Sequence, residues 1–155
     1  MLPMLTRTLN RPNDRLAILT FRLGSSTYAL LIEDVVEVEA MVELMPVLDG
    51  PPEVLGLVNR HGSILPLVDL RILFKQPASQ VSSLSFFIVA VHESWHIGLV
   101  VDEVHQVEYV NFIQMEETLA SGKYIRGMIN LRSQLIPVIA LAPLVEAFLA
   151  HQQAG

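Results

Sequence analysis

Two stretches of this sequence occur twice, at nearly the same interval. Residues 56–70 align with residues 127–141 at an offset of 71, so that a glycine, an asparagine, a proline and a final leucine coincide. Residues 29–38 align with residues 98–107 at an offset of 69. This repetition indicates two copies of one β-unit, each of about 65 residues. Because a unit so short buries little surface alone, we expect two small barrels that pack on one another.

The composition supports a self-contained core and excludes several classes of protein. Of the 155 residues, 52% are hydrophobic and 17% are charged, which excludes disorder for the body of the chain. The longest apolar stretch, residues 135–145, contains two prolines and is shorter than the ~20 residues of a membrane-spanning helix. The first residues lack the apolar segment of a signal peptide.

Cysteine content and charge narrow the choice further. The chain contains no cysteine, which excludes disulfides, thiolate catalysis and cysteine-based zinc sites. Its formal charge of −6 makes nucleic acid a poor partner. We therefore expect no nucleic-acid binding and no direct membrane insertion. The apolar excess indicates surface that is kept for protein partners.

The pattern of short apolar runs and turns predicts an all-β protein: two small five-stranded SH3-like barrels on a shared apolar core, with a short C-terminal helix. Residues 1–14 are expected to form a flexible tail and residues 15–155 the domain. The first barrel is assigned mainly to about 15–74, a linker to 75–85 and the second barrel mainly to about 86–141. Arg60-His61-Gly62 reads as a hairpin turn, and Pro143 as the start of a helix over about 143–151.

Several segments together resemble the CheW-like domain family, from about residue 16 to residue 149. They are Phe21-Arg22-Leu23-Gly24, Tyr28-Ala29, Val35-Val36-Glu37-Val38, Leu55-Gly56-Leu57-Val58-Asn59, Ile64-Leu65-Pro66-Leu67-Val68-Asp69-Leu70-Arg71 and Gly98-Leu99-Val100-Val101-Asp102-Glu103-Val104. The resemblance implies the same double barrel and no enzymatic activity, and we expect no cofactor and no metal. It also implies a cytoplasmic adaptor, recruited to membrane receptor arrays. The implied partners are the regulatory domain of a CheA-type histidine kinase and the helical cytoplasmic tips of chemoreceptors.

The resemblance also singles out partner-binding residues. These are Val35, Glu37, Gly56, His61, Val100 and Val101. Each has a plainer interpretation: the valines as ordinary core, the glycine as a point of close approach, and Glu37 as one solvated charge. Between residues 23 and 59 the chain has seven acids and no lysine or arginine. Such a one-sign stretch can steer a basic partner, and with the resemblance we favour a partner surface.

One position departs from the family pattern. The family usually has an arginine directly before the glycine of this turn, beside the glutamate that matches Glu37. Here that position holds His61, and Arg60 precedes it. Because neighbouring strand residues point to opposite faces, Arg60 is not expected to substitute automatically. A histidine that faced Glu37 would have a raised pKa, and partner binding would then vary between about pH 6 and 8.

The sequence also allows functions other than that of an adaptor. A small hydrolase could use Glu37 or Asp102 with His61 or His105, but adjacent carboxylates at 102 and 103 would face opposite ways on a strand. His92, His96 and His105 allow a metal site, although no helical HExxH motif is present. A CheW-like scaffold could also serve type IV pili or another output instead of flagellar motility.

Overall fold

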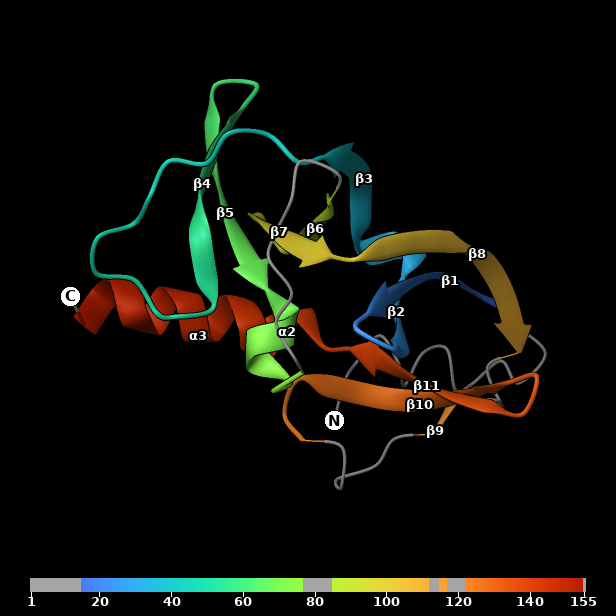
Figure 1. The fold of residues 1–155 in the computed structure, drawn as a ribbon. Coiled ribbons are helices and arrows are strands. Elements are labelled where there is room, and N and C mark those ends of the chain that lie inside the picture. Colours follow the sequence, from blue (N-terminus) through green and yellow to red (C-terminus); the bar gives the residue numbers. More distant parts are fainter. Residues whose placement is uncertain (1–14, 77–84, 112–114, 117–121, 155) are drawn as a thin grey trace.

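The strands form two curled sheets that lie side by side, with one helix along the second (Figure 1). The computed structural model describes residues 15–76, 85–111, 115–116 and 122–154; the expected tail and most of the expected linker, 77–84, lie outside them. Barrel A contains, in spatial order, β8 (Glu103–Asn111), β1 (Arg15–Leu23), β2 (Ser26–Leu31), β11 (Gln134–Ile139), β10 (Ile125–Leu131) and the short β9 (Met115–Glu116). Barrel B contains β3 (Val35–Ala40), β6 (Phe86–His92), β7 (Trp95–Val101), β5 (Ser63–Asp69) and β4 (Val54–Arg60). The all-β double-barrel prediction is confirmed, and the two-residue strand β9 adds a sixth strand to the five expected in barrel A.

Each barrel draws strands from both sequence copies. Strands β1 and β2 of the first copy join β8, β10 and β11 of the second, whereas β6 and β7 of the second copy join β3, β4 and β5 of the first. Four strand pairs join the two copies: the parallel pairs β2 with β11 and β5 with β7, and the antiparallel pairs β1 with β8 and β3 with β6. Division of the barrels into residues 15–74 and 86–141 therefore does not follow the strand pairing. The segment 75–85 connects β5 to β6 within barrel B and is not a boundary between barrels.

A single apolar core connects the two barrels. It includes Phe21 and Leu30 from barrel A and Ile88 and Leu99 from barrel B, all fully buried. Two smaller clusters fill the separate barrel interiors. Since the shared cluster contains strands of both sheets, neither barrel has a complete core without the other.

The helices and turns depart little from expectation. Helix α3 (Leu141–Ala154) begins two residues before Pro143, which lies in the first turn, where its missing N–H leaves no bond unmade. Asp69 caps the short helix α2 (Leu70–Leu73) by accepting a hydrogen bond from the Arg71 backbone N–H at 3.0 Å. A 3-10 turn, η1 (Ile32–Asp34), joins β2 to β3. Among the described residues no helix is long and apolar enough to cross a membrane.

The β4–β5 and β10–β11 hairpins each turn through two residues in the left-handed region. The turn between β4 and β5 consists of His61 (φ 52°) and Gly62 (φ 82°), so Arg60 is the last strand residue. The turn between β10 and β11 uses Arg132 (φ 51°) and Ser133 (φ 66°) at the equivalent positions. Positive φ at both central residues is the type I′ geometry that suits the strand twist.

Candidate partner-binding surfaces

An arginine joins the two edge strands of barrel B. β3 and β4 lie at opposite edges of this sheet. From the end of β4, Arg60 donates to Glu37 Oε1 through Nη2 at 2.5 Å and to Glu39 Oε2 through Nε at 2.7 Å. Its side chain is 17% exposed. The ion pairs close the barrel at this end.

Barrel A has the matching contact. Arg132, in the β10–β11 turn, donates to Glu108 Oε2 of β8 at 2.6 Å. Glu108 is the counterpart of Glu39 at the offset of 69. Both copies thus use an arginine of the hairpin to reach a glutamate of the edge strand, but the arginine stands one position earlier in the first copy.

Arg60 bonds to Glu37 although strand alternation argued against this contact. Gly56 and Val58 are buried on the inward face of β4, and Arg60 follows them at the same alternation, just beyond the core. Glu37 and Glu39 are likewise the half-buried residues of β3. His61 instead lies exposed at the hairpin tip, so the Glu37 carboxylate is bound by Arg60 and not by the histidine.

These contacts change the acidity of the glutamates. A hydrogen bond with the Glu39 carboxyl and then the bonds from Arg60 hold the pKa of Glu37 below its usual range. The Arg132 guanidinium, and after it the Gln106 amide, does the same for the pKa of Glu108. A lowered folded pKa stabilises the protein above the unfolded pKa of about 4.3, and this contribution is lost as pH falls through the lower folded value.

We predict that Arg60→Leu raises the pKa of Glu37 toward its usual range, because the substitution removes the cation and supplies the residue found at the equivalent position, Leu131. Carboxyl-carbon NMR titration of wild type and variant measures this shift. Arg132→Ala is the matched control: it should raise the pKa of Glu108 and leave that of Glu37 unchanged. Unchanged titration of Glu37 in Arg60→Leu would contradict the closure of the barrel by this arginine.

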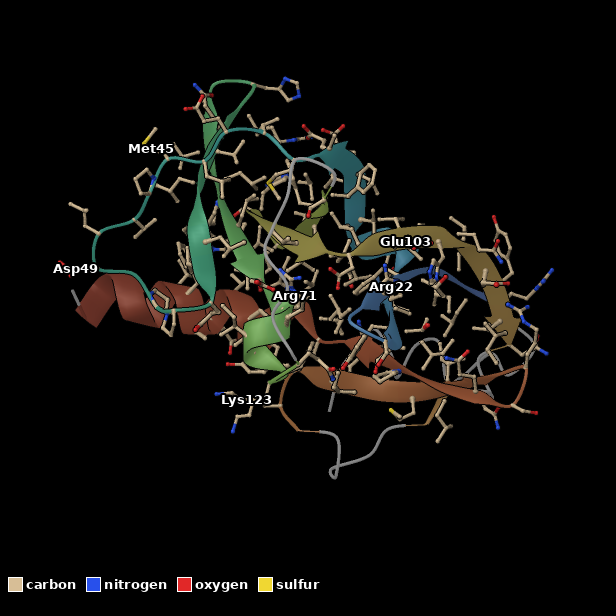
Figure 2. The ribbon with its side chains drawn as sticks, viewed as in Figure 1. Arg22, Met45, Asp49, Arg71, Glu103 and Lys123 are labelled. Atoms are coloured by element: carbon tan, nitrogen blue, oxygen red, sulfur yellow. The ribbon has the colours of Figure 1, made fainter. Side chains whose placement is uncertain are left out.

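An apolar segment lies exposed along the outer edge of barrel B. Between β3 and β4, four large apolar side chains are 36–94% exposed: Val42, Met45, Val47 and Leu48. Met45 is fixed to β4 by two backbone hydrogen bonds with Leu57, both 2.8 Å, and Met45 and Asp49 lie at the margin of the molecule (Figure 2). We call residues 42–48 the outer segment.

Gly56 explains why the outer segment can lie so close to β4. A Cβ at this position would lie 2.8 Å from the Met45 carbonyl oxygen and 3.2 Å from the Leu44 Cβ. A backbone atom cannot move aside as a side chain can, so only glycine fits here. Gly56 is buried, and it allows the outer segment to pack against β4. This agrees with the interpretation of Gly56 as a point of close approach.

A groove of about 600 Å³ lies on barrel B beside α3. Its walls are the β4–β5 hairpin, the turn between β6 and β7, and the middle of α3. The lining includes Arg60, His61, Ile64, Trp95, Ile97, Val145, Phe148 and Leu149. Ile64 is 68% exposed and Trp95 46% exposed. The groove therefore combines an apolar surface with the Arg60–Glu37 cluster at its margin.

The six residues singled out in the sequence do not form one surface. Val100 and Val101 are each 1% exposed. In this conformation their side chains belong to the apolar core and cannot contact a partner directly, contrary to the expectation from the sequence. Val35 is half-buried and packs against the shared core. Glu37 and His61 both approach Arg60, one through an ion pair and the other as its neighbour in the chain.

The alternative sites find little support in the described part of the chain. Asp102 bonds to Arg71 and to the Gly24 backbone, and His105 lies 3.5 Å from Glu103. Within residues 15–76, 85–111 and 122–154, no group of three or more histidine or carboxylate residues is placed to hold a metal ion.

The chain is thus a duplicated domain of two barrels that exchange strands and present exposed apolar side chains. Residues 17–147 match the CheW-like domain, and the chain belongs to this family. It is similar to the "Chemotaxis protein CheW" of Rhizobium meliloti, with 27% identity over 80% of this chain and 83% of that one. The protein of the same name from Klebsiella aerogenes is 26% identical, over 83% and 81%.

A solved structure shares the fold. The "scaffolding protein TtCheW" of Thermoanaerobacter tengcongensis superposes with a TM-score of 0.77 and 26% sequence identity. The match covers 82% of this chain and 90% of that chain. The comparison therefore includes both barrels, and the relatives are matched over most of their length.

Proposed function

We propose that this protein is a non-enzymatic adaptor that couples chemoreceptors to a CheA-type histidine kinase in a bacterial chemosensory pathway, and that it acts in the cytoplasm. Membership of the CheW-like family supports the class of function. The observation that carries the proposal is that one barrel presents two separate apolar surfaces, the outer segment and the groove beside α3. Two surfaces allow two partners to bind at once.

The outer segment is the proposed site for the kinase regulatory domain. Its four apolar side chains are held on a backbone that is hydrogen-bonded to β4, so little ordering is required on binding. Interfaces of this kind bury about 800 Å² on each partner, and a few central apolar residues supply most of the binding energy. Leu48, 94% exposed, has the most apolar surface to lose to a partner.

The groove is the proposed site for the helical tip of a receptor. An amphipathic helix places its apolar face in a groove of this kind and reads the margin through polar contacts. Ile64 and Trp95 supply exposed apolar surface, while Arg60, His61 and Glu37 supply the polar margin. The family departure at residue 61 falls at this margin and would alter receptor choice.

We predict that Leu48→Asp weakens binding to the kinase regulatory domain at least tenfold, because a carboxylate would be desolvated at the centre of the interface. The side chain is exposed, so the midpoint of urea unfolding should stay unchanged. Leu135→Asp is the matched control, since Leu135 is 63% exposed on barrel A. Isothermal titration of each variant with CheA-type kinases of the same genome decides the point, and equal affinities for wild type and Leu48→Asp would refute the assignment.

A further inference from the structure

Among the described residues, the ionisable side chains that line the groove beside α3 are all basic. They are Arg60 at the end of β4, His61 in the β4–β5 turn and His96 in β7. The other lining side chains are apolar, aromatic or carry a neutral hydroxyl. Since the chain has a formal charge of −6, a lining without carboxylates sets the groove apart from the rest of the surface.

Arg60 is already bound within the protein. Its Nη2 and Nε donate to Glu37 and Glu39 of β3, and its side chain is 17% exposed. Two carboxylates against one guanidinium leave one formal negative charge in excess at this side of the groove while His61 is neutral. The two histidines are therefore the lining groups whose charge can change near neutral pH.

His61 lies within the field of this cluster. The pKa of Glu37 is lowered first by its bond with Glu39 and by the bonds from Arg60, and also by the charge of His61. The histidine itself is exposed at the hairpin tip and is free to face an occupant of the groove. Its protonation balances the excess carboxylate charge on this wall.

His96 stands on a second wall of the groove. It is exposed at the start of β7 and is paired in register with Val91 of β6. The charged groups nearest in the neighbouring elements are Glu93, 3.8 Å from His92 in the β6–β7 hairpin, and the exposed Glu146 of α3. Neither carboxylate lines the groove, so protonation of His96 adds a positive charge to this wall.

The two histidines flank an apolar surface that suits a helix. An amphipathic helix that lays its apolar face on Ile64 and Trp95 carries its polar margins past the walls of the groove. Carboxylates on those margins would be attracted by imidazolium groups, whereas the excess negative charge beside a neutral His61 would repel them. Imidazole side chains gain their charge as pH falls through about 6.5.

We infer that the groove binds an amphipathic helix with acidic margins, and that His61 and His96 strengthen this binding as pH falls through the range in which imidazole is protonated. The inference rests on the proposed function only where it names a receptor tip as that helix. The outer segment contains no histidine, so kinase binding should not follow pH in this way.

Two synthetic helical peptides with the same apolar face, one with glutamate margins and one with lysine margins, test the charge preference without a receptor. The fluorescence of Trp95, the sole tryptophan, reports binding, because this side chain lines the groove and is 46% exposed. The glutamate peptide should bind about fivefold or more tightly at pH 6 than at pH 8. The lysine peptide should bind more weakly than the glutamate peptide at pH 6 and should not gain affinity as pH falls.

Variants of the histidines identify the groups that titrate. The double variant His61→Asn with His96→Gln should lose the pH dependence, and asparagine suits the left-handed backbone at residue 61. His61→Arg should keep tight binding of the glutamate peptide at pH 8; arginine fits this turn, since Arg132 has φ 51° at the equivalent position. His105→Gln is the matched control: this exposed histidine of barrel A does not line the groove, and the variant should titrate as wild type does.

Four results would overturn the inference: equal affinity for the two peptides, tighter binding of the lysine peptide, binding of neither peptide, or the same pH dependence in wild type and in the double variant. Receptor tips of the same genome are then measured across the same pH range. If the glutamate peptide behaves as expected and no receptor tip binds at any pH, the receptor role in the proposed function fails, whereas the charge preference of the groove stands.

Discussion

Phe21→Ala is expected to lower the free energy of unfolding by about 3–5 kcal/mol and to destabilise both barrels equally. The ring is fully buried in β1 of barrel A, within the core that the two barrels share, and removal of a buried phenylalanine side chain leaves a cavity of that cost. Trp95, the sole tryptophan, lies on β7 of barrel B. Urea unfolding followed by its fluorescence and by far-UV circular dichroism should therefore shift to one common midpoint.

Phe86→Ala is the control for this prediction. Phe86 is on β6 of barrel B and is 40% exposed, so its loss should lower the free energy of unfolding by about 1 kcal/mol or less. Two separate transitions in Phe21→Ala, with the Trp95 signal at its wild-type midpoint, would mean that barrel B is stable alone. That result would contradict a shared core built by strand exchange.

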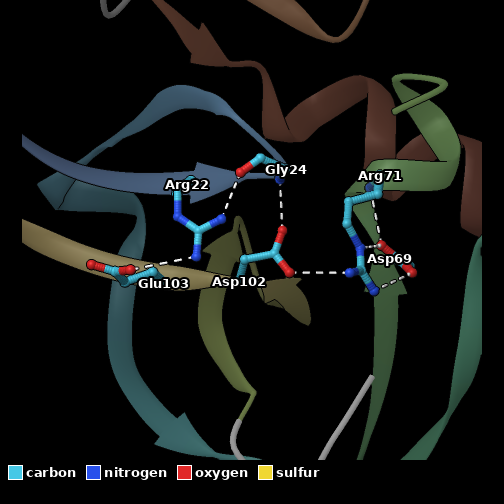
Figure 3. Close-up of polar contacts among 6 residues, drawn as sticks. All are labelled: Arg22, Gly24, Asp69, Arg71, Asp102 and Glu103. Atoms are coloured by element: carbon cyan, nitrogen blue, oxygen red, sulfur yellow. Dashed lines mark hydrogen bonds and ion pairs between the residues drawn. The ribbon is translucent and has the colours of Figure 1, made fainter. Parts of the chain in front are cut away.

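Arg71→Met should also lower the free energy of unfolding by about 3–5 kcal/mol, because it leaves the carboxylates of Asp69 and Asp102 near one another without their cation. Asp69 and Arg71 are 3% and 2% exposed, so water cannot replace the lost partner. The hydrogen bonds with Asp69 (Figure 3) raise the pKa of Arg71, although burial acts in the opposite direction. The guanidinium therefore stays charged at every pH used. Denaturant unfolding at pH 7 measures the loss.

Arg22→Met is the comparison for Arg71→Met. Arg22 pairs with Glu103 at 3.4 Å, and the two side chains are 39% and 57% exposed, so solvent screens their attraction and the expected change is about 1 kcal/mol or less. If the two variants lost equal stability, the buried network of Arg71 would contribute no more to stability than the exposed pair within barrel A.

The architecture could be predicted from the repeats, but the exchange of strands could not. The offsets of 71 and 69 identify two copies of one unit, and alternation within each strand identifies the inward faces. Pairing within a copy and pairing between copies place the same residues on the same faces. The pairs that join different copies, such as Leu67 with Gly98 and Leu19 with Val107, distinguish the two arrangements, and these residues carry no common sequence signal.

The candidate site was predicted in part. The resemblance pointed to Glu37 and His61, which lie near the groove margin, but also to Val100 and Val101, whose burial depends on the neighbouring strands. Strand alternation argued against a contact of Arg60 with Glu37, although Arg60 continues the inward face of β4. As the first basic residue after seven acids, it was the available signal. Leu48 lies in an irregular segment with no periodicity, so its exposure could not be inferred.

Simultaneous binding of both partners tests the adaptor most directly. Receptor tips immobilised on a surface should retain the kinase regulatory domain only when this protein is added. The amount of bound adaptor should not fall as the concentration of the kinase domain is raised. Ile64→Glu should abolish capture of adaptor by the tips while its affinity for kinase in solution is kept, and Leu48→Asp should do the reverse, since these exposed residues lie on separate surfaces. Displacement of the adaptor from the receptor tips by the kinase domain would contradict the account.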